Sequence, residues 1–246
     1  MLELNKIYCM KSLEFLKKID DSSIDCVVTS PPYNKGYWSR NRNTLNGFHT
    51  KSRRIQYGDF NDCIEPKDYE LQQREILNEL LRVIKPSGSI FYNHIDILFN
   101  HLTIHPTYIY DFPLKQIIIW NRGNTPKLDK SYFFPITEYI FWLKKSKDAR
   151  PIFDRHCCYF QNSIWNIRAA VENDHPAPFP LELAFNCVAA TCQPNDIVLD
   201  CYMGSGTTAI AAIKNKCNYI GCDMVESFVD MANRRIKQEQ AQRTLF

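Results

Sequence analysis

The stretch that decides the fold is "DIVLDCYMGSGTTAIAAIKNKCNYIGCD", from Asp196 to Asp223. It starts with an apolar run at 197–199, passes through two glycines into an alanine-rich segment, and ends with a second apolar run at 219–222 and an acid. A strand, a glycine turn, a helix and a second strand in this order are typical of a nucleotide-binding βαβ unit. The stretch therefore predicts a parallel sheet with a ligand site after its first strand.

The glycine turn carries the candidate cofactor-binding residues. Gly204 and Gly206 let the backbone come close to a ligand, and a helix that begins near Thr207 points free N–H groups at it. Asp223 ends the second strand, where a carboxylate can bond both hydroxyls of a ribose. Asp200 is an anion ahead of the glycines, which favours a cationic ligand such as a sulfonium or an amino group, although it could also merely cap the turn.

The same turn leaves a second enzyme class open. The spacing Gly204-x-Gly206-x-x-Ala209 fits the dinucleotide fingerprint, so an NAD-dependent oxidoreductase remains an alternative. No lysine follows the glycines as a P-loop requires, which argues against ATP hydrolysis.

Other apolar runs extend the sheet. Strands are expected at Cys26–Thr29, Ser89–Tyr92, Gln116–Trp120 and Tyr139–Leu143, and a helix over Tyr69–Val83 that stops at Pro86-Ser87-Gly88. Strands that alternate with helices indicate an α/β fold with a doubly wound, mostly parallel sheet. A length of 246 residues, 45% of them hydrophobic, suits a single domain over 1–246 with insertions.

The strand at Cys26–Thr29 runs directly into Ser30, Pro31, Pro32 and Tyr33. Each proline fixes its own φ and biases the preceding residue toward extended backbone, so the turn is held open and stiff. Its hydroxyl and carbonyls could receive a flat amine, and the Tyr33 ring could stack on a base. The alternatives are a plain polar turn at a strand end, or a Pro-Pro-Tyr ligand for a partner's aromatic groove.

Two segments do not fit the alternation and are expected to contact a ligand. Residues 35–57 form a basic loop with interleaved aromatic rings and no acidic residue, expected to be mobile, and residues 122–166 mix a strand-like run with Lys, Arg and rings. The cations of the first segment are candidates for phosphate contacts, with a solvated loop as the alternative: Lys35, Arg40, Arg42, Lys51, Arg53 and Arg54.

Composition narrows the setting. The net charge of +3 permits a polyanionic partner without requiring one. The N-terminal stretch lacks the pattern of a secretory signal, and no apolar run could span a bilayer, so we expect a soluble, cytoplasmic protein without a membrane partner. The ten cysteines form no C-x-x-C pair, which favours reduced, buried thiols over disulfides and predicts no metal site.

Several of these stretches together resemble a known family. "VVTSPPYN" at 27–34, "TEYIFWLKKSK" at 137–147 and "VLDCYMGSGTTAIAAI" at 198–213 are similar to the amino-DNA methyltransferases of bacterial restriction-modification systems. The Ser-Pro-Pro-Tyr tetrad precedes the glycine motif, which is the permuted order of the β group. The resemblance implies S-adenosylmethionine as the cofactor, a base flipped out of double-stranded DNA as the substrate, and a cognate restriction endonuclease as a possible partner of a monomer or homodimer.

The resemblance also assigns roles to residues. Ser30, Pro31 and Tyr33 would hold the flipped base, and residues 122–166 would be the target-recognition region. The cofactor would be surrounded by Asp200, Gly204, Ser205, Gly206, Thr207, Thr208, Asp223, Phe179 and Pro180. The chain departs from the family at Lys11, where relatives often have an acid, and at Cys201-Tyr202, which replaces the usual Pro-Phe.

The tetrad also bears on which base is methylated. Ser30 as its first residue resembles the N4-cytosine enzymes, whereas Asp or Asn is the usual N6-adenine pattern. Methylation of cytosine C5 is disfavoured because it needs a cysteine nucleophile, typically after proline, and no cysteine here follows a proline. We therefore expect N4-cytosine methylation, with N6-adenine as the alternative.

Overall fold

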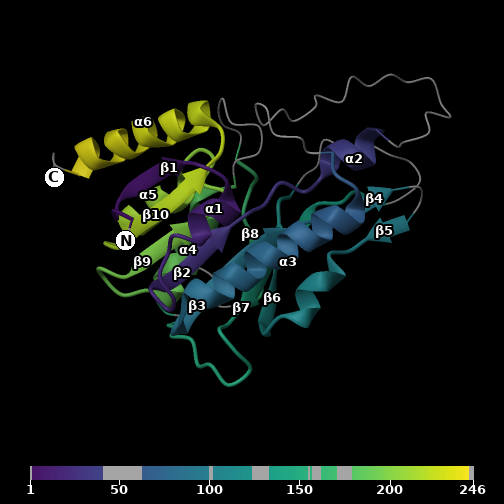
Figure 1. Cartoon of the computed structure of the whole chain (residues 1–246), viewed down its shortest axis with the longest axis horizontal. Coiled ribbons are helices and arrows are strands. Elements are labelled where there is room, and N and C mark those ends of the chain that lie inside the picture. Colours follow the sequence, from purple (N-terminus) through teal and green to yellow (C-terminus); the bar gives the residue numbers. More distant parts are fainter. Residues whose placement is uncertain are drawn as a thin grey trace.

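An eight-stranded central sheet organises the chain (Figure 1). The computed structural model describes residues 2–40, 63–99, 102–123, 133–154, 156, 162–170 and 179–243. Along the sheet the strands are β1 (Lys6–Cys9), β10 (Asn218–Asp223), β9 (Ile197–Asp200), β2 (Ile24–Thr29), β3 (Ile84–His94), β7 (Thr137–Leu143), β6 (Leu114–Asn121) and β8 (Ile164–Asn166).

The direction of the strands confirms the doubly wound, mostly parallel fold. From β1 to β3 all neighbouring strands are parallel, and β8 is parallel to β6. Strand β7 is antiparallel to both of its neighbours, β3 and β6. Each strand expected from the sequence is present. A separate two-stranded hairpin, β4 (Ile97–Phe99) and β5 (Leu102–Ile104), follows β3.

Helices cover both faces of the sheet. The described helices are α1 (Ser12–Leu16), α2 (Lys35–Arg40), α3 (Pro66–Val83), α4 (Leu181–Thr191), α5 (Thr207–Lys214), α6 (Glu226–Arg243) and the 3-10 helix η1 (Thr107–Asp111). In Figure 1, α1 and α3 lie in front of the sheet, whereas α6 lies beside β1 at the opposite end from α2 and the β4–β5 hairpin. Helices α4, α5 and α6 share one core with the sheet, and α1, α3 and η1 share the other.

The central strands are apolar on both faces because helices cover both. In β2, Cys26 and Val28 join the core with α4 to α6, while Val27 joins the core with α1 and α3. In β9, Val198 and Leu199 divide between the two cores in the same way. Side chains of a strand alternate between faces, so a strand buried on both faces has an almost continuous apolar sequence.

Helix α3 ends differently from the sequence expectation. Pro66 is its first residue, and Ile84 after its last residue already has extended backbone, with φ −70° and ψ 139°. Pro86, Ser87 and Gly88, expected to stop the helix, belong to β3 instead. A Cβ on Gly88 would lie 2.7 Å from the Asp25 carbonyl oxygen, so this glycine permits the close approach of β2 and β3.

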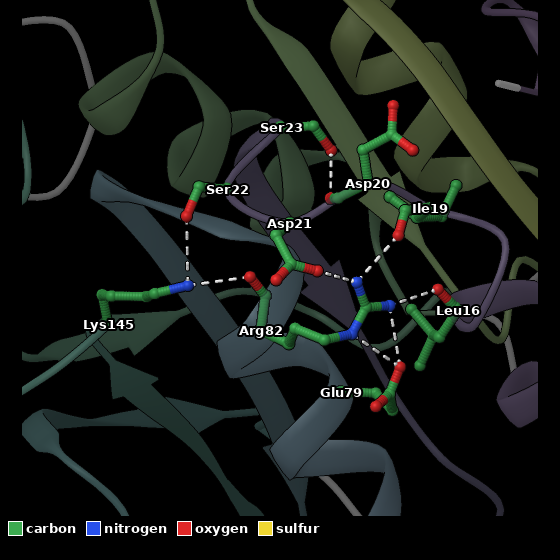
Figure 2. Close-up of polar contacts among 9 residues, drawn as sticks. All are labelled: Leu16, Ile19, Asp20, Asp21, Ser22, Ser23, Glu79, Arg82 and Lys145. Atoms are coloured by element: carbon green, nitrogen blue, oxygen red, sulfur yellow. Dashed lines mark hydrogen bonds and ion pairs between the residues drawn. The ribbon is translucent and has the colours of Figure 1, made fainter.

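A polar cluster fixes the end of the sheet where β2 begins (Figure 2). The guanidinium of Arg82, in the last turn of α3, donates to two carbonyls and two carboxylates, those of Leu16, Ile19, Glu79 and Asp21. Lys145, just after β7, donates to the Arg82 carbonyl at 2.7 Å. Because a parallel α/β sheet binds ligands at the carboxyl ends of its strands, this cluster serves stability.

The two expected insertions differ from one another. Residues 35–40 form α2, although a loop was predicted for 35–57, and residues 41–62 lie outside the described part of the chain. In the 122–166 segment, β7 and β8 belong to the central sheet itself. The eight cysteines within the described residues are free thiols, five of them buried, as their apolar surroundings predicted. Among the helices of the described residues, none has the length and apolar character needed to cross a membrane.

Candidate functional site

The site lies where the chain reverses its direction of winding. Strands β9 and β2 are parallel neighbours, with Cys26 opposite Val198 and Val27 opposite Leu199. From β9 the chain continues through α5 to β10 on one side, and from β2 it continues through α2 and α3 to β3 on the other. Connections that leave adjacent strands in opposite directions open a crevice at their carboxyl ends, where ligands bind. Both predicted motifs begin there.

Asp200, the last residue of β9, joins the two motifs. Its Oδ1 accepts hydrogen bonds from Thr29 Oγ1 at 2.7 Å and Tyr202 N at 2.9 Å, and its Oδ2 accepts one from Thr208 Oγ1 at 2.7 Å. The side chain is fully buried, and burial raises its pKa to about 6. The geometry thus favours the role of capping the turn over that of attracting a cationic ligand, because the carboxylate accepts hydrogen bonds from its own turn and from β2.

The glycine turn is held by Asp223 at the end of β10. The Asp223 Oδ2 accepts the Gly204 N–H at 2.9 Å, and its Oδ1 accepts the Val225 N–H at 2.9 Å. Burial raises the pKa of this carboxyl. Gly204 has φ 50°, a conformation that glycine adopts without strain. The carboxylate therefore fixes the turn, and its remaining lone pairs could still accept a hydroxyl.

Gly206 has a packing role in addition to the role inferred from the sequence. Its φ is 82°, and a Cβ at this position would lie 2.9 Å from the Cβ of Ala232 in α6. The missing side chain thus permits close packing of α6 against the turn, and the close approach of this backbone to a ligand stays a prediction. Gly206 is the N-cap of α5, whose first turn, like that of any helix, has backbone N–H groups without a helical partner.

One residue that contacts this turn was not found by sequence reasoning. Arg235 of α6 donates from its guanidinium NH1 to the Ser205 carbonyl at 2.6 Å and to Thr207 Oγ1 at 3.5 Å. It lies 30 positions beyond Ser205, and no motif marks it in the helix. Its position on the helix face toward the turn could have been found only once α6 was placed against α5.

The remaining predicted cofactor residues lie around the start of α5 and at the start of α4. Ser205, Thr207 and Thr208 are buried at its start and in the first residues of α5, and Pro180 is the N-cap of α4. Phe179 packs, partly buried, against the core that α4 and α5 share. A glycine turn at a helix start and a carboxylate at the next strand end suit a nucleoside with a charged tail, and so these residues could hold S-adenosylmethionine.

The Ser-Pro-Pro-Tyr turn enters a second polar cluster on the other side of the crevice. Ser30 Oγ and Tyr33 Oη are 2.7 Å apart. Asn93 Nδ2, near the end of β3, donates to Tyr33 Oη at 2.7 Å and to Glu138 Oε2 at 2.8 Å. Arg122 NH1 lies 3.1 Å from Glu138 Oε1. These five side chains are called the tetrad network below: Ser30, Tyr33, Asn93, Arg122 and Glu138.

Strand β7 brings Glu138 to this edge because it runs antiparallel. Its first residues lie beside the last residues of β3, with Asn93 opposite Ile140 and His94 opposite Tyr139. Glu138 is 6% exposed and Asn93 4% exposed. Sequence reasoning missed both residues, although a glutamate inside the apolar run "TEYIFWL" was a signal, since a buried carboxylate needs a partner.

The surroundings of Tyr33 bear on the prediction that its ring could stack on a base. The side chain is 7% exposed, its ring centroid lies 5.0 Å from that of His94, and Lys35 Nζ lies 4.9 Å from the ring centroid. Burial lowers the pKa of His94 to about 4, so this neighbour is neutral at pH 7. The Tyr33 ring offers little free face for stacking, and its hydroxyl is the part that connects to other groups.

The predicted phosphate-binding cations are only partly within the described residues. Lys35 opens α2, directly after the tetrad, and Arg40 is its last residue. Arg42, Lys51, Arg53 and Arg54 lie outside the described part of the chain. Pro31 is buried and Pro32 half-buried between Ser30 and Tyr33.

The fold is the Rossmann-like type of the S-adenosylmethionine-dependent methyltransferases, with the two motifs meeting where β9 and β2 lie side by side. The model of a protein family described as DNA methylase, of the N6/N4 type, matches residues 24–234, and the chain belongs to this family. This confirms the resemblance to the amino-DNA methyltransferases. It leaves the NAD-dependent oxidoreductase without support.

Curated relatives are similar along almost the whole chain. The type II methyltransferase M.BglII of Bacillus subtilis is 29% identical over 274 residues, which cover 96% of this chain and 70% of the relative. The type II methyltransferase M.HinfI of Haemophilus influenzae is 27% identical over 259 residues, covering 96% of this chain and 69% of the relative.

Solved structures share the fold at lower identity. The PvuII DNA methyltransferase, described as cytosine-N4-specific, superposes with a TM-score of 0.71 at 18% identity, covering 94% of this chain and 89% of that structure. The M1.HpyAVI–SAM complex superposes with a TM-score of 0.64 at 19% identity, covering 94% and 98%. At these identities the likeness concerns the fold.

Proposed function

We propose that this protein transfers a methyl group from S-adenosylmethionine to the exocyclic N4 amine of cytosine in double-stranded DNA, after the base is flipped out of the helix. The observation that carries the proposal is the 2.7 Å hydrogen bond between Thr29 and Asp200, since it fixes the Ser-Pro-Pro-Tyr turn beside the glycine turn. A methyl donor on one turn and an amine on the other would then be neighbours. Ser30 as the first tetrad residue and the N4-cytosine specificity of the similar PvuII enzyme support cytosine.

The cofactor would bind on the β9–β10 side. Asp223 would accept ribose hydroxyls, the turn around Gly204 would contact the methionine part, and Phe179 would line the pocket. S-adenosylmethionine supplies an electrophilic methyl group on a sulfonium. The M1.HpyAVI–SAM complex, a structure of the same fold, supports this choice.

Ser30 would activate the amine by accepting a hydrogen bond from it. The lone pair of an exocyclic amine is delocalised into the ring, which makes the nitrogen a weak nucleophile. Accepting both amine hydrogens, at the Ser30 hydroxyl and the Pro31 carbonyl, draws the nitrogen toward tetrahedral geometry and localises the lone pair. In-line attack then depends on positioning, which can contribute much of the rate, and no covalent enzyme intermediate is needed.

Other parts of the chain would hold the DNA. The cations of residues 35–57 would contact phosphates next to the flipped base, and residues 122–166 would read the target sequence. A restriction endonuclease that cuts the same site would be a functional partner of a cytoplasmic enzyme that acts as a monomer or homodimer.

The test is to incubate the protein with tritiated S-adenosylmethionine and unmethylated bacterial DNA, digest the DNA to nucleosides, and identify the labelled nucleoside by chromatography and mass. Label in N4-methylcytosine is expected. A Ser30→Ala variant should lose roughly 100-fold in methyl transfer, because one hydrogen bond that acts in the transition state is removed, while calorimetry shows unchanged cofactor affinity.

The matched control is Ser23→Ala. Ser23 lies at the opposite end of β2, and its hydroxyl donates to the Asp20 carbonyl (Figure 2). This variant should keep the wild-type rate. Label in N6-methyladenine would favour the adenine alternative and overturn the use of Ser30 as the mark of cytosine, and no label in any base would overturn the proposed function.

A further inference from the structure

The tetrad network contains one hydrogen whose position decides what Ser30 can do. Tyr33 Oη has a single hydrogen, and within the described residues Ser30 Oγ at 2.7 Å and Glu138 Oε2 at 3.4 Å can each accept it. It already accepts a hydrogen bond from Asn93 Nδ2. If Tyr33 donates to Ser30, one lone pair of Ser30 is occupied; if Tyr33 donates to Glu138, Ser30 donates to Tyr33 instead.

The carboxylate of Glu138 favours the second arrangement. An ionised carboxylate is a stronger acceptor than a neutral hydroxyl. Arg122 NH1 lies 3.1 Å from the other carboxylate oxygen, and Asn93 Nδ2 donates to Oε2 at 2.8 Å. Because Glu138 and Asn93 are almost completely buried, water does not compete strongly for these hydrogen bonds.

We propose that Glu138 is a positioning residue for methyl transfer, which acts through the Tyr33 hydroxyl and not by contact with the substrate. It holds the Tyr33 hydrogen, so that Ser30 donates its own hydrogen to Tyr33 and turns both lone pairs toward the amine. The inference rests on the proposed function, because it concerns the residue that receives the amine.

The proposal predicts that the hydrogen bond between Tyr33 and Ser30 reverses its direction when the charge of Glu138 is removed. In a Glu138→Gln variant, the neutral amide attracts the Tyr33 hydrogen less, and Tyr33 donates to Ser30. The Ser30 hydrogen then points at the amine and competes for the lone pair that must attack. Glutamine preserves the shape of the side chain, so the change is chiefly one of charge.

The experiment is a double-mutant cycle with Glu138→Gln and Tyr33→Phe, measured as single-turnover methyl transfer with saturating cofactor and DNA. Glu138→Gln should slow transfer roughly 100-fold, a size known for single hydrogen bonds that act in the transition state. Tyr33→Phe should slow it only about tenfold, since Ser30 loses a partner but keeps its lone pairs. The double variant should match Tyr33→Phe alone, so that removal of the Tyr33 hydroxyl restores activity to Glu138→Gln.

Tyr92→Phe is the control for loss of a buried hydroxyl. Tyr92 lies next to Asn93 in β3, and its hydroxyl donates to Gln73 at 2.5 Å on the other face of the sheet. This variant should transfer methyl groups at the wild-type rate. Cofactor and DNA affinities of Glu138→Gln should stay within about threefold of wild type, because the residue touches neither ligand.

Each outcome decides between different claims. A double variant as slow as the product of the two single losses would show that Glu138 acts independently of the Tyr33 hydroxyl, and a wild-type rate in Glu138→Gln would remove its role altogether. If Glu138→Gln does not fold, a Tyr33→Phe protein that is slower than Ser30→Ala also overturns the proposal. A wild-type protein that labels no base would refute the proposed function and this inference with it.

Discussion

The two sides of the switch point are built in different ways. On the β9–β10 side, Asp200, Gly204 and Asp223 belong to one βαβ unit and bond mainly to one another's turns. On the β3–β7 side, Asn93 and Glu138 come from strands that are distant in sequence and meet only through the register of the sheet. The first side is a local structure, whereas the second exists only after the whole sheet has formed.

The two sides also differ in how completely their polar groups are paired. All three hydrogen bonds to Asp200 are between 2.7 and 2.9 Å. In contrast, Asn93 Oδ1 and Arg122 Nε are buried and without a hydrogen-bond partner in the described part of the chain. An unpaired buried polar atom costs about 1–3 kcal/mol. The comparison indicates that the β9–β10 side, called the cofactor side, is rigid and contributes to stability. The β3–β7 side, called the base side, keeps hydrogen-bonding capacity that is not used.

The largest effect that would test this contrast is expected for Asp200→Ala. The substitution removes the carboxylate that accepts from the Tyr202 N–H and from the hydroxyls of Thr29 and Thr208, of which Thr208 keeps the Val28 carbonyl at 3.2 Å. We expect the free energy of unfolding to fall by about 3 kcal/mol, measured by urea denaturation at pH 5, below the Asp200 pKa of about 6. If Glu138→Gln lowers the free energy of unfolding by as much as Asp200→Ala in the same experiment, the two sides do not differ in their contribution to stability.

Asp200→Asn adds a check on the charge itself. Burial raises the folded-state pKa of Asp200 to about 6, above the value of an exposed aspartate. The folded state therefore binds the proton more tightly, so this residue stabilises the fold most at low pH and the contribution is lost as pH rises through about 6. Between pH 4 and 7, about the window set by the two pKa values, wild type should lose stability relative to Asp200→Asn. Parallel stability curves would contradict the assigned burial.

The same contrast explains what could be predicted from the sequence. The turn from Asp200 to Asp223 was found because its glycines, helix and acid are contiguous, and local geometry fixes their relations. Ser30 and Tyr33 were found because two prolines mark them. These are the residues whose neighbours in space are also neighbours in the chain.

The remaining site residues could not be found in this way. Glu138 reaches Tyr33 only because β7 is antiparallel and lies between β3 and β6, and no local pattern encodes that order. Arg235 reaches Ser205 only because α6 packs on the turn through Gly206. In each case the missing information was the placement of one element against another, which depends on the packing of the whole core.

A smaller effect is expected for Gly206→Ala, with Gly123→Ala as its matched control on the base side. The two glycines have similar φ values, 82° and 78°, but a Cβ on Gly206 meets Ala232, whereas a Cβ on Gly123 meets no described residue within 4 Å. Gly206→Ala should destabilise the protein by about 2–3 kcal/mol, because strain and a steric clash add. Gly123→Ala should cost about 1 kcal/mol, from backbone strain alone. Equal losses in thermal or urea unfolding would show that α6 does not need this close approach.

The smallest effect is expected for Arg235→Gln, which removes a side-chain contact to the glycine turn and leaves the residues of the turn unchanged. Arg235→Gln removes the donor to the Ser205 carbonyl, and the exposed neighbour Arg234 in the same helix offers Arg234→Gln as a control with the same change in charge. Loss of one hydrogen bond from a charged donor should weaken S-adenosylmethionine binding about tenfold, measured by calorimetry, with little change in stability. Arg234→Gln should bind as wild type does. If both variants bind alike, the helix holds the turn through Gly206 and Ala232 alone, and the rigidity of the cofactor side comes from packing and not from the hydrogen bond.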